Sequence, residues 1–414
     1  MKNTKKYLIL QLQQTCYNSY TYFTGQIARL LRGHGHEVVV FSSAKHPIRE
    51  LEQFAGTHFD AVIDCSSGAP RLTMEEGGYF FDCIDAPFFN LLLDHPLYHH
   101  DSLKCGLKNY HVRCLDENHA AYVREYYPHI KSVGLWTATG SSAAEVSCDA
   151  GVAGNANLSS GQDGQRLASD LSAPLPISRR KIPALFTGTY TDPDEIMRAI
   201  GELPPFIRSD LKLLIAELLE HTEQTIEGAI RSLGDRLESY LPEAMPLYVH
   251  SCLLADTYVR AFRRRELLRA AERARLPLAL YGDSWEKLPR AADSTLTLHG
   301  QVPFTRTFSL MADSRITLNL MPEFKAGFHD RIFSAMLNGS VAATDPSTRL
   351  AREFTDGKEL LFYDAAQPDE ACERLRRALE APERLQQIAD AGLAAGMRFS
   401  WNALFHQDQM EEIL

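Results

Sequence analysis

The sequence predicts an α/β protein with two Rossmann-like domains. Short apolar runs alternate with helical segments over residues 1–136, and the same alternation returns after residue 181. The stretch between them, 137–180, has few large apolar residues. Repeated strand–helix–strand alternation indicates parallel sheets with helices on both faces. A chain of 414 residues is also too long for one ordinary core.

The strands of the first domain, 1–136, are expected where apolar and β-branched residues run together. These runs are residues 7–12, 37–42, 59–65, 88–93, 109–115 and 132–136. Apolar residues at helical spacing predict helices over 19–31, 47–54 and 117–126. The segment 137–180 is rich in Gly, Ser, Ala and Asn, so we expect a flexible linker or loop there.

The second domain, 181–400, repeats the pattern with an interruption. Its expected strands are residues 181–188, 276–281, 295–298, 316–320, 340–344 and 359–362. Leucines at helical spacing predict a helical insertion at about 193–243, and the chain should end in a helix over 401–414. The basic segment 261–275 also reads as a helix. Because Glu266 and Glu272 separate its arginines, we expect a solvated face there.

The composition argues against a nucleic-acid partner and against membrane insertion. The formal net charge is -10, whereas proteins that wrap a polyanion carry a basic face. None of the eight cysteines stands in a C-x-x-C pair or at zinc spacing, which favours reduced thiols in the cytoplasm. The apolar run near the start is too short for a secretion signal, and no segment reaches the roughly 20 apolar residues of a membrane span. We therefore expect a cytoplasmic protein.

The segment 316–335 is the most informative for function. A hydrophobic strand runs into a loop with Lys325 and Gly327, and a helix begins near His329. Free N–H groups and the positive end of that helix would suit a diphosphate. Gly327 would permit close approach, and Lys325 or Arg331 would add a charged hydrogen bond. A plain strand–helix unit with a solvated loop gives the same pattern.

Two further strand ends carry polar residues that could hold a nucleotide. Tyr281, Gly282 and Asp283 end one strand, and Gly188 and Thr189 end another. At the first of these strand ends, the alternative interpretation is a glycine turn beside a core tryptophan.

The D-x-D string Asp192-Pro193-Asp194 is of the type that holds a metal-bound nucleotide. An aspartate followed by proline is also what a helix start requires, with Asp192 as N-cap and Pro193 at the first helical position. We expect the helix start, and no metal site.

In the first domain, Asp94 and His95 follow an apolar strand. Either could take a proton from an acceptor hydroxyl. His95, His99 and His100 are an alternative metal cluster, although Pro96 disturbs a regular helical pairing of histidines. A structural polar loop is the third interpretation.

These motifs, in this order, resemble the CgeB-like (spore-maturation type) branch of the group 1 glycosyltransferases, within the GT-B superfamily. The resemblance covers about residues 180–400 well and 1–135 loosely. The matching stretches are Phe186-Thr187-Gly188, Tyr281-Gly282-Asp283-Ser284-Trp285, His299-Gly300, Leu318-Asn319, residues 327–335, residues 354–359 and Leu93-Asp94-His95-Pro96.

The resemblance implies a GT-B fold, with two domains facing a cleft and the last helix, around Trp401, crossing back to the first domain. It implies a nucleotide-diphosphate sugar as donor, no cofactor and no essential metal. The acceptor would be a protein, glycan, lipid carrier or small molecule, with His95 or Asp94 assisting its hydroxyl. The donor-binding residues would be Gly188, Thr189, Tyr281, Gly282, Asp283, His299, Lys325, Gly327, His329 and Arg331.

The sequence departs from the wider group at one pair of positions. Two glutamates eight residues apart, which flank the donor in that group, correspond here to Ala326 and Ser334. Glu323 or Asp330 are candidates to replace them. The loss leaves open a degenerate GT-B protein acting as a binding or regulatory module. A separate alternative is an epimerase acting on a nucleotide sugar.

Overall fold

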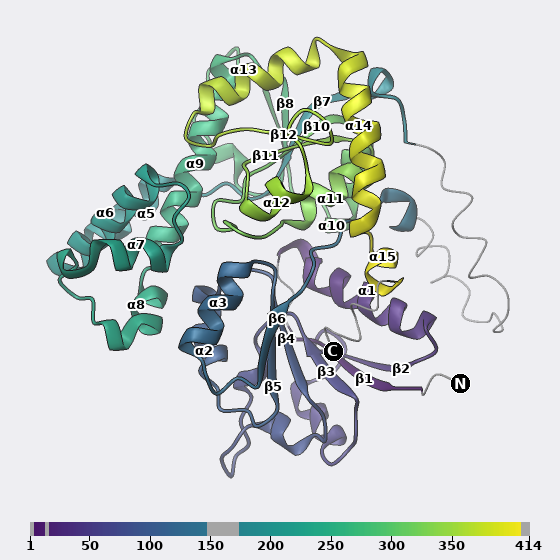
Figure 1. Cartoon of the computed structure of the whole chain (residues 1–414), viewed down its shortest axis with the longest axis vertical. Helices are drawn as coiled ribbons and strands as arrows, with labels where there is room; N and C mark the ends of the chain where they lie inside the picture. Colours follow the sequence, from purple (N-terminus) through teal and green to yellow (C-terminus); the bar gives the residue numbers. More distant parts are fainter. Residues whose placement is uncertain (1–3, 13–15, 147–173, 407–414) are drawn as a thin grey trace.

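The computed structural model describes residues 4–12, 16–146 and 174–406. These residues form two six-stranded sheets, parallel throughout, with helices on their faces (Figure 1). The predicted pair of Rossmann-like α/β domains is confirmed.

The N-terminal sheet has the strand order β2-β1-β3-β4-β5-β6. Its strands are β1 (Lys6–Gln11), β2 (Glu37–Ser42), β3 (Ala61–Asp64), β4 (Phe88–Leu92), β5 (Tyr110–Cys114) and β6 (Ser132–Leu135). The α-helices of this domain are α1 (Ser19–Gly33), α2 (His100–Leu103) and α3 (Glu117–Tyr126). Residues Ile48–Phe54, expected as an α-helix, form a 3-10 helix. This segment buries only Leu51, so no apolar stripe holds a longer helix against the core.

The C-terminal sheet has the order β12-β11-β10-β7-β8-β9. Its strands are β7 (Ile182–Thr187), β8 (Leu278–Tyr281), β9 (Leu296–His299), β10 (Ser314–Asn319), β11 (Val341–Thr344) and β12 (Leu361–Phe362). The helices around it are α10 (Phe304–Ala312), α11 (Asp330–Leu337), α12 (Thr348–Glu353), α13 (Pro368–Leu379), α14 (Pro382–Gly396) and α15 (Trp401–His406).

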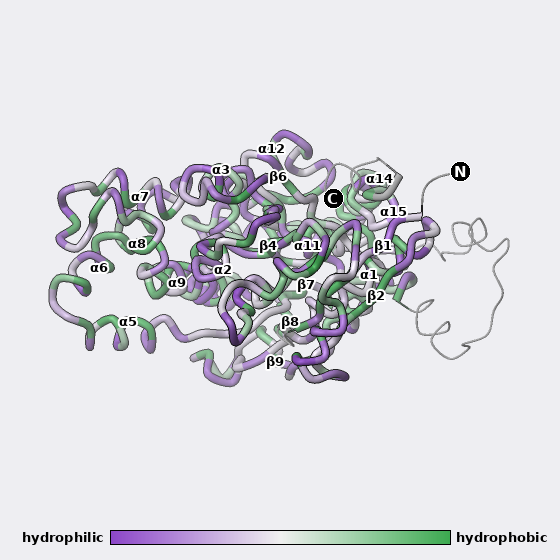
Figure 2. The backbone as a smooth tube through the Cα atoms, turned by 90° about the horizontal axis from the view of Figure 1, so that it is seen from below, coloured by the Kyte–Doolittle hydropathy of each residue, from purple (hydrophilic) through white to green (hydrophobic). Residues whose placement is uncertain are grey.

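A group of helices between β7 and β8 forms a separate lobe beside the two domains. They are α5 (Pro193–Gly201), α6 (Pro205–Glu220), α7 (Ile226–Leu233), α8 (Met245–Ser251) and α9 (Leu253–Arg273). Figure 2 shows α5–α8 projecting to one side, while α9 returns to the C-terminal sheet. We call α5–α8 the helical lobe. It also contacts the N-terminal domain, since α8 packs on α2.

The strands are apolar because helices cover both faces of each sheet. Every residue of β3, β4 and β11 is buried. Among the described residues, no helix is long and apolar enough to cross a bilayer.

The described part of the expected linker, 137–146 and 174–180, includes closely packed residues. Gly140 pairs with Ser400, and the backbone N–H of Ser141 donates to Ser334 Oγ of α11 at 3.1 Å. The indole N–H of Trp401 donates to Ser141 Oγ at 3.0 Å, and its ring contacts Trp136 of the N-terminal domain. These contacts attach the start of α15 to both domains. The remainder, 147–173, lies outside the described residues, as do residues 407–414 of the expected last helix.

Replacing Gly140 with alanine tests this junction. A Cβ there would lie 2.4 Å from the carbonyl carbon of Phe333 and 2.6 Å from the nitrogen of Ser334. Two backbones must move apart to admit it, so we expect a lower melting temperature, equivalent to about 1–3 kcal/mol of lost stability. Gly25→Ala in α1 is the control, because nothing lies within 4 Å of a Cβ there. Equal melting temperatures for the two variants would contradict the packing at Gly140.

Candidate functional site

The strand order reverses at one point in each sheet. In the N-terminal sheet the point lies between β1 and β3, and in the C-terminal sheet between β7 and β10. In open parallel sheets ligands bind beyond the carboxyl ends of the strands at such a point. Contacts between loops at these ends bring the two reversal points together, so the candidate site lies between the domains.

Tyr17 connects the two reversal points directly. It follows β1, and its hydroxyl lies 2.6 Å from Thr189 Oγ1, just beyond β7. The backbone N–H of Asp283, beyond β8, donates to the same hydroxyl at 3.2 Å. Tyr17 and Asn18 both adopt left-handed backbone angles, with φ of 60° and 68°. Asparagine tolerates such angles, but they are unfavourable for tyrosine and tend to occur at functional sites.

Three arginines meet near this contact. Arg260 and Arg264 come from α9, and Arg331 comes from the first turn of α11. Burial, together with the charges of Arg260 and Arg331, lowers the pKa of Arg264 to about 10. Burial also lowers the pKa of Arg331. An anion bound among these side chains would relieve their mutual repulsion.

Each arginine of this cluster also has a fixed partner. Arg331 donates to Asn319 Oδ1 at 2.8 Å, and Arg264 donates to the carbonyl oxygen of Thr189. Arg260 Nε lies 3.0 Å from Asp256, and its NH1 lies 3.8 Å from Glu323. The guanidinium groups are therefore held in position without a ligand.

Lys325 points away from the arginines. Its ammonium group donates to the carbonyl oxygen of Thr222 in the helical lobe, and burial lowers its pKa. It lines a cavity of about 1450 Å³ beyond the carboxyl ends of β10, β11 and β12, whose walls include Phe324, Asp345 and Tyr363. Burial raises the pKa of Asp345 to about 6.

Gly327 allows a close approach of the N-terminal domain. A Cβ at Gly327 would lie 2.7 Å from the carbonyl oxygen of Leu115 and 2.8 Å from the Cα of Asp116. Asp116 is completely buried, and its Oδ2 accepts from the N–H of Ala326 at 2.7 Å. At the start of α11, His329 Nδ1 accepts from the N–H of Arg331 at 3.2 Å. Two of the N–H groups expected to meet a diphosphate thus have partners within the protein.

The outer strands β8 and β9 end in a stacked pair. The rings of Tyr281 and His299 lie 4.2 Å apart at an angle of 5°. Gly282 has φ of 143°, and a Cβ there would lie 1.9 Å from the carbonyl oxygen of Gly188. Glycine is therefore required where these two turns meet. Asp283 is exposed beside them.

Asp94 and His95 lie at the carboxyl end of β4. His95 is buried, and its Nδ1 accepts from the backbone N–H of Leu97 at 3.0 Å. Since Nδ1 accepts, the proton of the neutral ring is on Nε2, which lies 3.5 Å from Glu227 Oε2 of α7. His95 therefore has no free lone pair in this arrangement. Asp94 is half-buried.

The two alternative metal motifs have structural partners. His100 Nδ1 lies 2.9 Å from the hydroxyl of Tyr127. Asp192 caps α5 by accepting from the N–H of Asp194 at 3.0 Å, and the carboxylate of Asp194 lies 2.8 Å from Arg265. In the part of the chain that the structure describes, no group of three or more His, Cys, Asp or Glu side chains has a metal-binding arrangement.

The positions that lack glutamates are occupied by contacts between the domains. Ala326 donates to Asp116, and Ser334 accepts from Ser141. Of the two candidate replacements, Glu323 faces Arg260, whereas Asp330 lies 3.0 Å from His329 Nδ1. Both carboxylates thus lie near the arginine cluster, Glu323 beside Arg260 and Asp330 beside Arg331.

No sequence motif marks Tyr17, Arg260 or Arg264. The basic run on α9 was the one feature of the sequence that could have indicated Arg264. Because glutamates separate its arginines, we expected a solvated face instead. That expectation is wrong for part of the helix: Arg263 and Arg265 are buried, and Arg264 is half-buried over the ring of Phe186.

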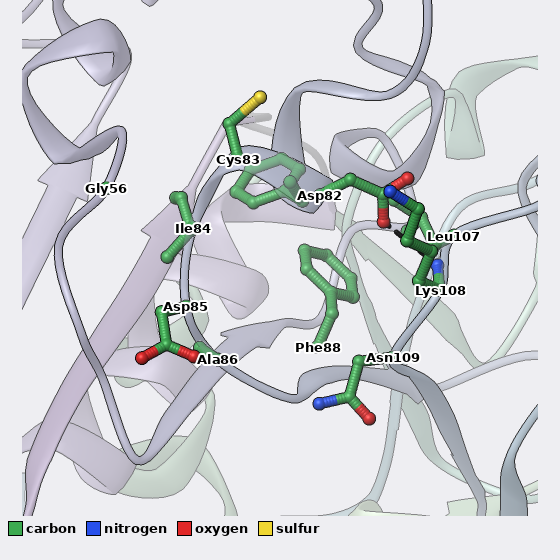
Figure 3. A pocket seen from close by; sticks show the side chains of 11 residues that line it. Gly56, Asp82, Cys83, Ile84, Asp85, Ala86, Phe88, Leu107, Lys108 and Asn109 are labelled. Atoms are coloured by element: carbon green, nitrogen blue, oxygen red, sulfur yellow. Dashed lines mark hydrogen bonds between the residues drawn. The ribbon is translucent and has the colours of Figure 1, made fainter.

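A smaller cavity of about 310 Å³ lies in the N-terminal domain (Figure 3). It is lined by Phe88, the first residue of β4, and by Leu107, Lys108 and Asn109 just before β5. These are the amino ends of the strands, opposite the edge that carries Asp94. It is therefore separate from the candidate site.

Two solved structures match the chain over almost its whole length. An alpha-glucosyltransferase in complex with UDP-glucose and DNA containing an abasic site matches with a TM-score of 0.54, at 9% identity, over 99% of this chain and 100% of its own. The sucrose-phosphate synthase of Thermosynechococcus elongatus matches with a TM-score of 0.50, at 10% identity, over 99% and 98%. The chain has the GT-B fold. The fold expected from the sequence is therefore confirmed.

Within the GT-B fold, a family model described as glycosyl transferase-like matches residues 263–407. The match runs from α9 through β8–β12 to the last helices, so the resemblance to this family lies in the C-terminal region. No curated protein matches the chain. The narrower resemblance to the CgeB-like branch stays a prediction.

Buried histidines beside the cleft predict a loss of stability in acid. Burial, with a smaller effect of His95, lowers the pKa of His119 from about 6.5 to about 4. The unfolded chain thus binds the proton more readily, and stability present above pH 6.5 is lost as the pH falls toward 4. We expect His119 to contribute about 3 kcal/mol to the free energy of unfolding above pH 6.5. Urea unfolding at a series of pH values should show a smaller acid loss for His119→Phe than for the wild type.

His58→Gln is the control for this series, because His58 is exposed and pairs only at the surface with Asp85. It should keep the acid dependence of the wild type. Identical pH dependence in all three proteins would mean that His119 is not buried as a neutral ring.

Proposed function

We propose that the protein is a glycosyltransferase that moves a sugar from a nucleotide-diphosphate donor to an acceptor hydroxyl. The observation that carries the proposal is the cluster of Arg260, Arg264 and Arg331 at the strand reversal point of the C-terminal sheet. The glycosyl transferase-like match of the same region supports it.

The arginine cluster suits the diphosphate of the donor. Guanidinium groups bind phosphate oxygens through paired, charge-assisted hydrogen bonds. As the bond to the sugar breaks, negative charge grows on the departing diphosphate, and fixed cations near it lower the barrier. They supply the charge that a divalent cation supplies in other sites, so we expect activity to persist in the presence of a chelator.

The nucleoside would lie toward β8 and β9. The stacked rings of Tyr281 and His299 and the turns at Gly188 and Gly282 lie at that end of the candidate site. Uridine is the first base to test, because the alpha-glucosyltransferase with this fold was solved with UDP-glucose.

The acceptor would enter from the N-terminal side, at the end of β4. We propose Asp94 as the base for its hydroxyl, since a carboxylate needs no change of tautomer to accept a proton. His95 would donate through Nε2 and hold the acceptor in place. Contact of Tyr17 with Thr189 would keep the cleft closed and limit hydrolysis of the donor.

A non-catalytic binding protein is the second candidate, favoured by Ala326 and Ser334 at the two positions where the wider group has glutamates. Slow release of free sugar from a bound nucleotide sugar would support the transferase. Tight nucleotide binding without any turnover would support the binding protein.

Melting temperatures with a panel of nucleotides and nucleotide sugars, measured without added metal, test the donor site. A bound ligand raises the melting temperature according to its concentration relative to Kd. We expect one nucleoside diphosphate to stabilise the wild type, and Arg331→Ala to weaken its binding about tenfold or more, the loss expected for one charged hydrogen bond.

Arg264→Gln should weaken binding of the same nucleoside diphosphate to a similar degree. Arg269→Ala is the control, since Arg269 lies on the same helix α9 but pairs with Glu266. A wild type that responds to no nucleotide would refute the donor-site assignment. Equal weakening by Arg269→Ala would show that the loss comes from the helix and not from the cluster.

A further inference from the structure

Buried polar atoms without partners gather where the helical lobe meets the N-terminal domain. They are Nε2 of His95, Nε2 of His99, Nδ1 of His119 and Oε2 of Glu227. All four residues are at least nine-tenths buried. An unsatisfied buried polar group costs about 1–3 kcal/mol, so such a gathering requires an explanation. We call this place the lobe seam.

The contacts within the lobe seam show that these residues are neighbours. Nε2 of His95 lies 3.5 Å from Oε2 of Glu227. The rings of His95 and His119 meet edge to face at 4.5 Å. His119 is on α3, and Glu227 is on α7 of the helical lobe. The N-terminal domain thus forms one side of the lobe seam, and the helical lobe forms the other.

The protonation states follow from the hydrogen bonds. Nε2 of His119 lies 3.2 Å from the carbonyl oxygen of Glu323, so this nitrogen donates and Nδ1 of the neutral ring holds a free lone pair. His95 has the opposite tautomer, because its Nδ1 accepts a hydrogen bond and its proton is on Nε2. Burial raises the pKa of Glu227, but the neighbouring His95 and Thr225 outweigh it and hold the pKa at about 2. The seam therefore offers one donor, one acceptor nitrogen and one carboxylate.

A group that both donates and accepts hydrogen bonds satisfies all three. A phosphate only accepts, and Glu227 would repel it. An ammonium group only donates, and would leave His95 Nε2 unpaired. A hydroxyl both donates and accepts, so adjacent hydroxyls could accept from His95 and donate to Glu227 and to His119. Among the described residues, no metal-binding group of side chains exists to offer another explanation.

We propose that the lobe seam binds the hydroxyl groups of a sugar acceptor, with Glu227 of the helical lobe as a binding residue. The inference rests on the proposed function and adds the recognition of its second substrate. Glu323 connects the seam to the arginine cluster, because its carbonyl oxygen accepts from His119 and its carboxylate faces Arg260.

Ligand-observed NMR with glucose, galactose, mannose and N-acetylglucosamine, and with their methyl glycosides, tests this site. We expect at least one sugar to bind the wild type. Glu227→Gln and His119→Phe should each weaken its binding about tenfold, equivalent to about 1.4 kcal/mol. Binding of a methyl glycoside would indicate an acceptor sugar that is already linked to another molecule. Binding of the free sugar alone would indicate a free sugar.

Glu223→Gln is the matched control, because Glu223 lies in the same lobe but is exposed. It should bind the sugar like the wild type. UDP binding, measured in parallel, should be unchanged in Glu227→Gln, which also shows that this variant is folded. No sugar binding by the wild type, or equal binding by Glu227→Gln, would overturn the inference and leave only buried water in the seam. Loss of UDP binding in the wild type would instead refute the donor site.

Discussion

The buried carboxylate of Asp116 is the interaction on which the arrangement of this protein depends. One oxygen caps α3 by accepting from Asn118 and His119, at 2.7 and 3.3 Å, and the other accepts from Ala326 of the C-terminal domain at 2.7 Å. A buried carboxylate needs such donors to offset its lost hydration. The cap of α3 forms within the N-terminal domain, whereas the bond from Ala326 forms only when the domains are together. The same carboxylate therefore fixes the start of α3 and joins the two domains.

This coupling explains why the cleft is shaped as it is. With the backbones of Asp116 and Gly327 in contact, the loop after β10 turns Lys325 toward the helical lobe and Glu323 toward Arg260. The three arginines remain together on the side of β7. The loop after β10 therefore lies between the arginine cluster, which would bind a diphosphate, and the polar groups that would bind an acceptor.

Several site residues follow from the sequence because they depend on strand ends. Gly188 and Gly282 lie just beyond runs of apolar residues, and Arg331 begins the helix that follows another such run. Parallel strands bring their carboxyl ends to one edge. The direction of a loop side chain depends on what packs against it, so the partners of Lys325 were not predictable. For the same reason nothing in the sequence relates Arg264 or Tyr17 to this edge.

The sequence by itself determined the two parallel sheets, because buried strands and amphipathic helices are local patterns of apolar residues. It also identified the interruption by helices after β7 and the strand ends that face the cleft. Only the tertiary structure decided that the lobe covers His95, that Asp116 joins the domains and that α9 supplies two arginines to the site. These are contacts between residues far apart in the sequence, and their geometry depends on how completed elements pack.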